Sequence, residues 1–255
     1  MSFTLQMSDR TNMEAMFTFL ASITDDVLLE FHSNGIQCKT MDKQQIALVD
    51  LSINKDTFTE YTGSFPALVG LNTGYILKAL KSGNKDDILT MIYPGADTIK
   101  LSFVGVQRKF EVCLNLIEVS GFNGNVSVPD NTMTVAFQTE LFVSSIHNLA
   151  IFSEDIRICY TAGAFAFEVP SVVSNDFSGT SITFNDIQIT GILTETKELF
   201  IIKYLELYGK MAKAIFFDVS MCVRPNAPLV LRADNNFMAV SLYIAPKIDQ
   251  DQDQD

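Results

Sequence analysis

Residues that commonly hold metals or form disulfides are scarce in this chain. Its 255 residues include four cysteines, two histidines and no tryptophan. The cysteines are far apart and no CxxC pair occurs, so a Cys/His metal site has few ligands to draw on. We therefore predict no metal site, and we expect Cys38, Cys113, Cys159 and Cys222 to be buried, reduced thiols that pack as small hydrophobic side chains.

Long hydrophobic runs are also absent. The longest apolar runs are interrupted by Lys, Asp or Gly and stay well below the roughly 18 residues that a membrane-spanning helix requires. The first residues, MSFTLQMSDR, lack the basic start and apolar middle of a secretory signal. With 47% hydrophobic and 19% charged residues, the composition is globular. We expect a soluble, intracellular protein with no membrane partner.

Signatures of catalysis are missing as well. The sequence has no GxxxxGK[ST], GxSxG or HExxH motif, and no dinucleotide-binding glycine pattern follows a predicted strand. Carboxylates cluster in SGNKDD and in the C-terminal DQDQDQD, and could in principle hold Mg²⁺. A surface turn and an acidic tail explain these clusters more simply. We predict that the chain is not an enzyme, with no catalytic residue and no cofactor.

Basic residues are in the minority. The chain has 18 Lys and Arg against 30 Asp and Glu, which gives a formal net charge of −12. Taken alone, this charge argues against a nucleic-acid-binding protein, since attraction to phosphate requires Lys and Arg. However, net charge averages over the whole surface and leaves open where the basic residues lie.

What the sequence does contain is a repeated order of helices and strands. Apolar residues at helical spacing predict helices at 10–23 and 72–83 in the first half, with strands between and after them. The second half repeats this order, with helices predicted at 139–152 and 202–214. A repeat of element types with little identity of letters indicates a duplicated domain.

Local signals support the limits of the first two helices. Thr11 and Glu14 have the spacing of a capping box, which favours a helix start next to them. Asn72 is a suitable N-cap for the second helix, and Gly83 is a suitable end for it.

These patterns together predict an α+β protein. We expect two similar domains, each with two helices packed on antiparallel sheets. The predicted boundaries are 1–116 for the N-terminal domain, 117–131 for an interdomain connecting loop, 132–248 for the C-terminal domain and 249–255 for an acidic, disordered tail.

Lysine pairs recur on the second helix of each half. Lys78 and Lys81 lie three residues apart and share a helix face, and so do Lys210 and Lys213. Any one such pair is most simply a solvated helix face. Their recurrence at equivalent helices suggests that one surface of an otherwise acidic protein is basic.

The residues resemble a known family from end to end. The stretches GIQCKTMDKQQIALVDLSI, LNTGYILKALKSGNKDDI, NAPLVLRAD and above all YIAPKI followed by an acidic tail are similar to the proliferating cell nuclear antigen (PCNA) family of DNA polymerase sliding clamps. The resemblance implies a clamp fold with two domains per chain and a homotrimeric ring. Duplex DNA would pass through a hole that the helices line.

In such a ring, weak and non-specific phosphate contacts let the protein slide along the DNA. The resemblance and the lysine pattern together assign these contacts to the helices. The predicted DNA-facing residues are Arg10, Lys78, Lys81, Lys203, Lys210 and Lys213.

The chain departs from the family in its basic lining. The first helix offers only Arg10, and the helix at 139–152 has no Lys or Arg, whereas the family usually places several basic residues on both. The inner surface is therefore expected to be less positive than in a typical clamp. Either DNA is held more weakly or a partner helps to hold it.

The resemblance also implies a pocket for partner peptides that carry a Gln and a hydrophobic-aromatic plug. The matching positions are Met41, Gln45, Ile46, Leu48, Val126, Val128, Pro228, Tyr243, Ala245 and Pro246. Leu48, Val126 and Pro228 could equally be ordinary core residues, and Gln45 is where the family often has another polar residue. The stretch VSGFNGN also looks longer than the usual linker.

Ring closure in the family comes from antiparallel strand pairing between neighbouring chains. RKFEVCLNL would supply one edge, with Phe110 at the subunit interface, and SGTSITF would supply the other. An unpaired edge strand promotes aggregation unless a defined neighbour covers it.

The implied function is a processivity factor for DNA replication and repair. Its partners would be encircled duplex DNA, DNA polymerase, a clamp loader and other proteins with PIP-box-like peptides, either in the nucleus or at a viral replication site. Two alternatives stay open: a checkpoint- or transcription-type clamp subunit of a heteromeric ring, and a β-rich interaction protein that never encircles DNA.

Overall fold

The computed structural model describes all residues except 123, 125–131, 170–177 and 248–255. The chain divides into two compact units, the first comprising residues 1–124 with 234–240, and the second comprising 125–233 with 241–255. In the described part of the chain, no helix is long and apolar enough to cross a membrane. The predicted loop 117–131 lies only partly within the described residues, and the predicted tail lies outside them.

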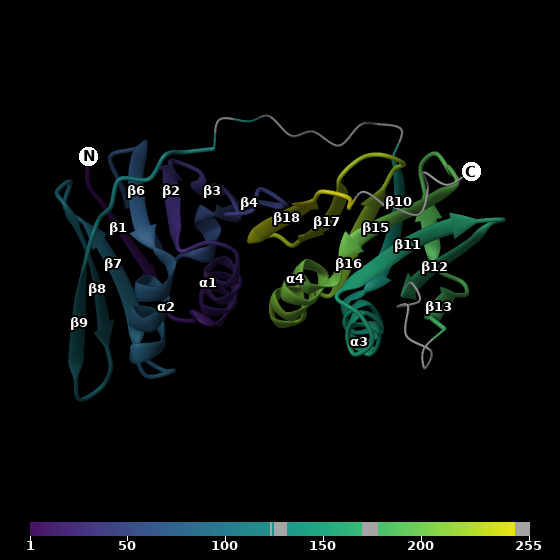
Figure 1. The fold of residues 1–255 in the computed structure, drawn as a ribbon. Helices are drawn as coiled ribbons and strands as arrows, with labels where there is room; N and C mark the ends of the chain where they lie inside the picture. Colours follow the sequence, from purple (N-terminus) through teal and green to yellow (C-terminus); the bar gives the residue numbers. More distant parts are fainter. Residues whose placement is uncertain (123, 125–131, 170–177, 248–255) are drawn as a thin grey trace. The chain divides into compact units, whose positions relative to one another are not determined.

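Before residue 117, the described part of the first unit contains two α-helices, one short 3₁₀ helix (η1) and nine strands (Figure 1). Its elements are β1 (Phe3–Met7), α1 (Thr11–Ile23), β2 (Asp26–His32), β3 (Gly35–Met41), β4 (Ala47–Asn54), η1 (Lys55–Thr57), β5 (Glu60–Gly63), β6 (Ala67–Asn72), α2 (Thr73–Ser82), β7 (Ile88–Tyr93), β8 (Thr98–Val104) and β9 (Lys109–Asn115). One sheet has the order β5-β1-β7-β8-β9, and a second has the order β6-β2-β3-β4.

The second unit repeats this order of elements. It contains β10 (Met133–Gln138), α3 (Thr139–Ala150), β11 (Asp155–Thr161), β12 (Ala164–Val169), β13 (Thr180–Phe184), β14 (Gln188–Thr190), β15 (Thr196–Ile201), α4 (Ile202–Ile215), β16 (Asp218–Val223), β17 (Leu229–Asp234) and β18 (Met238–Ile244). Its sheets run β13-β12-β11-β15 and β14-β10-β16-β17, and the division between the two units falls within β18.

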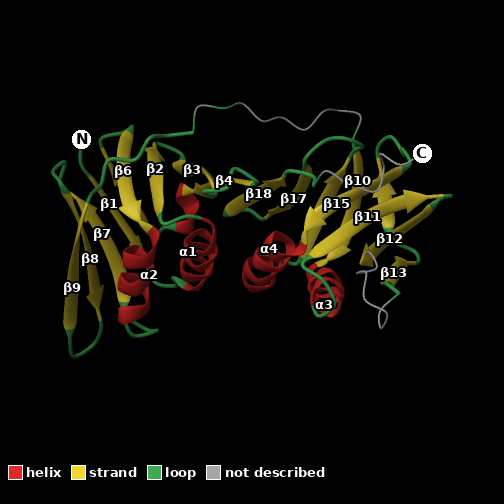
Figure 2. Ribbon diagram, viewed as in Figure 1, coloured by secondary structure: helices red, strands yellow, loops and turns green. Residues whose placement is uncertain are grey.

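The described strands pair in antiparallel fashion. Leu5 of β1 lies opposite Met91 of β7, and Val135 of β10 lies opposite Met221 of β16. In each unit the helices lie against strands rather than apart from them (Figure 2). The predicted fold class, α+β with two helices on antiparallel sheets in each of two similar domains, is confirmed.

The helices dock because each buries one apolar stripe. Met16 and Leu20 of α1 are at most 1% exposed, and Ile76 and Leu80 of α2 are fully buried. Phe142 of α3 is fully buried as well. Burying one side chain of this size contributes about 1.5–3 kcal/mol relative to leaving it in water, so these stripes are enough to hold the helices on the sheets.

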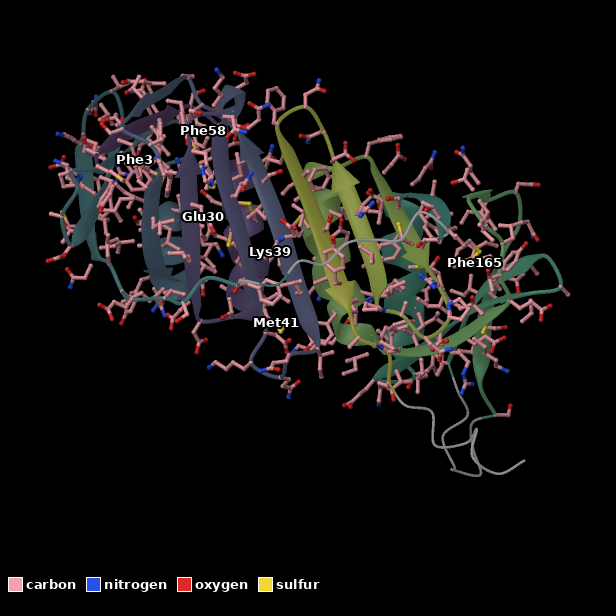
Figure 3. All side chains as sticks on the ribbon, turned by 90° about the horizontal axis from the view of Figure 1, so that it is seen from above. Phe3, Glu30, Lys39, Met41, Phe58 and Phe165 are labelled. Carbon is pink, nitrogen blue, oxygen red and sulfur yellow. The ribbon has the colours of Figure 1, made fainter. Side chains whose placement is uncertain are left out.

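The opposite face of the first unit's sheet carries charged residues. Side chains alternate along β2, β3 and β4, so Glu30 and Lys39 project away from the buried side (Figure 3). Lys39 forms an ion pair with Asp50 of β4 at 3.0 Å, across the register that places these two residues opposite each other. These charged side chains are therefore partly solvated and lie outside the core.

Two local predictions hold and one is wrong. The side chain of Asn72 accepts a hydrogen bond from the Tyr75 amide at 3.1 Å, and α2 ends at Ser82 next to Gly83, as the sequence predicts. The capping box does not form, because the carboxylate of Asp9 accepts the Thr11 amide at 2.9 Å and Glu14 instead pairs with Arg10.

The cysteine prediction needs one correction. Cys38, Cys159 and Cys222 are buried, but Cys113 is exposed. Cys113 lies on β9, whose residues are exposed or half-buried along the whole strand because β9 is the outer strand of its sheet. Burial raises the pKa of the Cys38 thiol to about 12, so this thiol stays protonated and unreactive at neutral pH.

Candidate nucleic-acid interface

Helix α2 presents an exposed, positively charged stripe. Tyr75, Lys78 and Lys81 follow one another at three-residue spacing, and all three are exposed. The Lys78 ammonium lies 5.3 Å from the centre of the Tyr75 ring, which orients the lysine along the helix surface. The buried side of the helix carries Ile76 and Leu80 instead.

Helix α4 presents the corresponding stripe in the second unit. Lys203, Lys210 and Lys213 are all exposed, at offsets of seven and three residues, which places them along one side of the helix. The half-buried Glu206 lies between them in sequence. The Nζ of Lys203 lies 5.7 Å from the centre of the Tyr204 ring.

The charge on these stripes is mostly not neutralised. Within the described residues, Lys78, Lys81, Lys203 and Lys210 form no ion pair, whereas Lys213 pairs with Glu140 of α3 at 2.9 Å. On the strands, by contrast, Lys100 and Lys109 both pair with Glu111, at 2.9 and 3.0 Å. These two lysines hold the pKa of the Glu111 carboxyl at about 2. Free positive charge is therefore available on α2 and α4.

Helices α1 and α3 add no exposed cation to these stripes. On α1 the exposed positions include Thr18 and Ser22, whose hydroxyls donate to carbonyls of their own helix at 2.7 and 2.9 Å. On α3 the exposed residues include Glu140, Ser144 and His147. Both helices therefore lack Lys and Arg over their whole length, as the sequence indicates.

The structure corrects the assignment of Arg10. This residue is only 6% exposed, and its guanidinium donates to the carbonyls of Leu80 at 3.1 Å and Gly83 at 2.7 Å. It also pairs with Glu14 at 2.7 Å. Arg10 thus ties the start of α1 to the end of α2, and its charge is not available to phosphate.

The sequence analysis missed one cation near this face. Lys85 is exposed and lines a hollow of about 330 Å³ together with Lys81, Asp9 and Glu14. The sequence had a signal for it, because Lys85 stands in SGNKDD, a stretch that we interpreted only through its carboxylates. Asp9 and Glu14 make this hollow mixed in charge rather than basic.

The residues predicted for a partner-peptide pocket differ in exposure. In the first unit, Met41 and Ile46 are half-buried and Gln45 is exposed, while Leu48 is 3% exposed and belongs to the core. The turn that carries Ile46 is held by Asp42, whose Oδ1 accepts the Ile46 amide at 2.8 Å.

In the second unit, the residues predicted for the partner-peptide pocket also differ in exposure. Pro228 is exposed, Ala245 and Pro246 are half-buried, and Tyr243 is 7% exposed. The Lys247 amide donates to the Leu199 carbonyl at 2.8 Å, so the segment after β18 is attached to β15. Val126 and Val128 lie outside the described residues.

The two strands predicted to form subunit edges are both outer strands. β9 is the last strand of the first unit's five-stranded sheet, and β13 is the last strand of the second unit's four-stranded sheet. Phe110 on β9 is 37% exposed, and its ring centre lies 5.9 Å from that of Phe103.

Comparison with known proteins supplies relatives over nearly the whole chain. Residues 3–120 match the model of the PCNA N-terminal domain. The DNA polymerase sliding clamp of Methanobrevibacter smithii is 23% identical, with 98% of this chain and 100% of the relative covered. PCNA of Caenorhabditis elegans is 23% identical over 92% of this chain and 93% of the relative, and a probable DNA polymerase sliding clamp 1 of Paramecium bursaria Chlorella virus 1 is 22% identical over 91% and 92%.

The duplicated α+β architecture, with two helices on antiparallel sheets in each unit, is that of the DNA clamp fold. This defines the class of protein. The match of the first domain and the similarity along the full length then point to one family. Residues 3–120 match its N-terminal domain, and the chain is similar from end to end to members of the PCNA family of sliding clamps.

Proposed function

We propose that this protein is a sliding clamp that encircles duplex DNA as a homotrimeric ring and tethers DNA polymerase during replication. The observation that carries the proposal is the pair of lysine stripes on α2 and α4, at equivalent places in the two units, in a chain of net charge −12. Exposed and unpaired ammonium groups bind phosphates without regard to sequence, which is the contact a sliding protein needs. The relatives named as sliding clamps support the same role.

The acidic excess has a use in this proposal. Negative surface away from the helices repels DNA, so that binding is favoured only at the lysine stripes. The protein would act by encircling DNA and by binding other proteins, without catalysing a reaction. Its place of action would be wherever the DNA is replicated, in a nucleus or at a viral replication site.

The lysine stripes are tested by charge reversal at Lys78 and Lys210 together. We expect Lys78→Glu with Lys210→Glu to weaken retention on closed circular DNA and polymerase stimulation at physiological salt. Each lost phosphate contact also lowers the salt dependence of binding by about one unit of log–log slope.

The matched control is Lys55→Glu with Lys197→Glu, which makes the same change in net charge at exposed residues off the four helices. The control is expected to bind DNA nearly as the unmodified protein does. If both double variants bind alike, the DNA does not contact α2 and α4. Urea unfolding of both variants checks that neither change disrupts the fold.

We further propose that partners dock through a short peptide with an apolar plug. Met41 and Ile46 of the first unit are half-buried apolar residues of the kind that such a plug contacts. Within the second unit, Ala245 and Pro246 are half-buried apolar residues of the same kind. Leu48 would support this surface from the core rather than touch the peptide.

A synthetic peptide with a Gln and two aromatic residues tests this docking site. Binding is expected for the unmodified chain and is expected to fall at least about tenfold for Ile46→Asp and for Pro228→Asp, because an apolar contact is replaced by a charge. Binding that is unaffected by both substitutions would place the peptide elsewhere.

A heteromeric clamp is the second candidate, and the absence of Lys and Arg on α3 favours it. A chain with a sparse lining would suit a ring whose other subunits supply more positive charge. The mass of the purified protein in solution separates the two candidates, since a heteromeric subunit alone would not form a trimer.

A further inference from the structure

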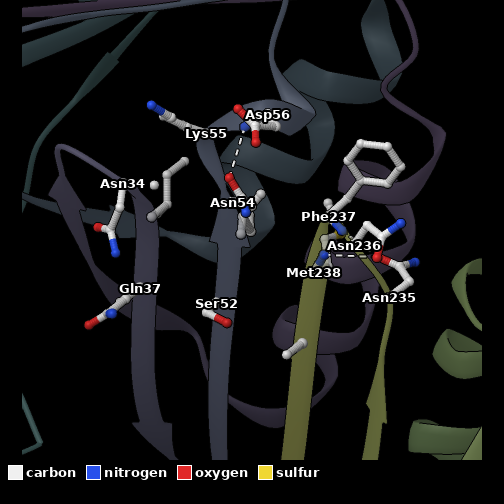
Figure 4. Close-up of a pocket in the computed structure, with 14 residues that line it drawn as sticks. Asn34, Gln37, Ser52, Asn54, Lys55, Asp56, Asn235, Asn236, Phe237 and Met238 are labelled. Atoms are coloured by element: carbon white, nitrogen blue, oxygen red, sulfur yellow. Dashed lines mark hydrogen bonds between the residues drawn. The ribbon is translucent and has the colours of Figure 1, made fainter.

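A polar hollow of about 450 Å³ lies in the first unit, and no residue of α1 or α2 is among those that line it (Figure 4). Three segments line it: the β2–β3 turn with the start of β3, the end of β4 with η1, and residues 235–239. All of these residues belong to the first unit. None of the residues that we assign to DNA or to the partner-peptide site lines this hollow.

Phe237 is held at the edge of the hollow with its ring in solvent. The side chain of Asn235 accepts hydrogen bonds from the Phe237 and Met238 amides, both at 2.9 Å. The Phe237 carbonyl accepts from the Asn54 amide at 2.7 Å and from the Thr57 hydroxyl at 3.1 Å. The backbone of Phe237 is therefore fixed on both sides, yet its side chain is 47% exposed.

An exposed aromatic ring on a fixed backbone is well suited to binding. Contact with a partner costs little conformational entropy, because the main chain is already ordered and the side chain has only two rotatable bonds. Aromatic residues of this kind are enriched among the residues that dominate interface energies. The turn itself does not need an aromatic side chain at position 237. Its hydrogen bonds involve only the backbone of this residue, so a polar residue there would keep them.

Side-chain amides and a hydroxyl also line this hollow. Asn34 and Gln37 lie along one side of the hollow, Asn236 and Phe237 along the other, and Ser52 lies between them (Figure 4). Gln37 and Ser52 are directly opposite each other in the β3–β4 register. Within the described residues, the side chains of Asn34, Gln37 and Asn236 form no hydrogen bond to the protein.

The charge of the hollow limits the kinds of ligand that it can bind. Lys55 and Asp56 are its two charged residues, so its formal charge is zero, and the whole chain is strongly acidic. Nothing in this arrangement attracts a polyphosphate or a nucleic-acid backbone. Amide side chains both donate and accept hydrogen bonds, which matches the alternating N–H and C=O groups of an extended polypeptide.

We propose that this hollow binds an extended polypeptide segment of a partner protein. An apolar side chain of that segment packs on Phe237, and its main-chain groups bond to Asn34, Gln37 and Asn236. The site shares no residue with the proposed DNA contacts or with the proposed docking site for plug-bearing peptides.

The test uses the full-length protein and a phage library of random linear peptides. Peptides selected on the unmodified chain are synthesised, and their binding is measured by fluorescence anisotropy. Those that still bind the variant with Ile46→Asp and Pro228→Asp are kept, which removes ligands of the other docking site. We expect such peptides to exist and to contain an apolar residue flanked by uncharged ones.

Binding of the retained peptides is expected to fall about tenfold or more for Phe237→Ser, and about threefold to tenfold for Gln37→Ala, where one hydrogen bond is lost. Phe217→Ser is the control, because Phe217 is 78% exposed and belongs to the second unit. The control is expected to bind normally.

Two results would overturn the proposal. One is that no peptide survives the Ile46→Asp and Pro228→Asp selection, or that the survivors bind Phe237→Ser unchanged. The other is that an oligothymidylate, rather than any peptide, loses binding on Phe237→Ser. Because solution mass and DNA retention are not expected to change in Phe237→Ser, failure here is distinguishable from failure of the sliding-clamp function.

Discussion

Asp87 shows how much one buried side chain organises. It is 3% exposed, and its carboxylate accepts the Asn84 amide at 2.8 Å and the Arg108 guanidinium at 3.0 Å. Its main-chain carbonyl lies 3.5 Å from a guanidinium nitrogen of Arg10. The side chain also lies so close to Gly105 that a Cβ there would be 2.3 Å from Asp87 Oδ1. Asp87 thus joins the loop after α2 to the turn that leads into β9.

We predict that Asp87→Asn lowers the urea midpoint of unfolding at neutral pH. The Asn84 amide and then Arg108 hold the pKa of the Asp87 carboxyl below its usual value of 3.8, although burial opposes this shift. A carboxyl with a lowered folded-state pKa stabilises the protein above its unfolded pKa, and this contribution is lost as the pH falls through the folded-state pKa.

The difference between the unmodified protein and Asp87→Asn is therefore expected to be largest at neutral pH and to shrink below about pH 4. Asp86→Asn, at the exposed neighbouring residue, is the control and is expected to leave the midpoint unchanged. A difference of equal size at both pH values would mean that the ionised carboxylate is not the stabilising group.

At this scale, the sequence predicts exposure on a regular helix face, but not where partners distant in sequence or the place of a strand in its sheet decide it. Helical spacing placed Lys78 and Lys210 on solvated faces, and both are exposed. Arg10 was predicted to face DNA because it opens a helix, but its partners Leu80 and Gly83 are some seventy residues away and have no local signature. Cys113 lies in an apolar stretch, and only its place on an outer strand explains its exposure.

At the scale of elements, β9 is the most consequential strand. It pairs with β8 on one side through seven residue pairs, and it is the outer strand of its sheet. An outer strand with unpaired backbone groups can accept another strand, and charge on such a strand prevents this. If β9 pairs with a strand of a neighbouring chain, a carboxylate introduced at position 110 weakens that pairing.

We predict that Phe110→Asp shifts the assembly toward single chains. The measurement is size-exclusion chromatography with light scattering across a range of concentrations. Val106→Asp is the control, because Val106 is fully exposed in the turn before β9 and the added charge is the same. Equal masses for Phe110→Asp and the unmodified protein would show that β9 is not a subunit edge.

Most elements could be predicted from sequence, whereas their junctions could not. Apolar spacing was sufficient for the four helices, since each has one clear buried stripe. The strands β1, β5, β6 and β15 escaped prediction. In β5, Glu60–Gly63 has no buried residue and pairs only with β1. The capping box does not form because Asp9, one residue before the predicted start of the helix, accepts the Thr11 amide instead.

At the scale of the whole molecule, the account depends on charge and on repetition. A net charge of −12 coexists with lysine stripes on α2 and α4, so the surface is not uniformly acidic. The repeat means that each chain supplies two such stripes. The sequence could predict these stripes because both lysine pairs fall on amphipathic helices at equivalent places. It could not predict the hollow beside Phe237, which depends on residues some two hundred positions apart.

Sedimentation equilibrium of the purified protein shows whether copies of this chain join into a closed ring. We predict a mass three times that of the 28.3 kDa chain at micromolar concentration, without any other subunit. A mass equal to that of one chain throughout this range would contradict a homotrimeric ring.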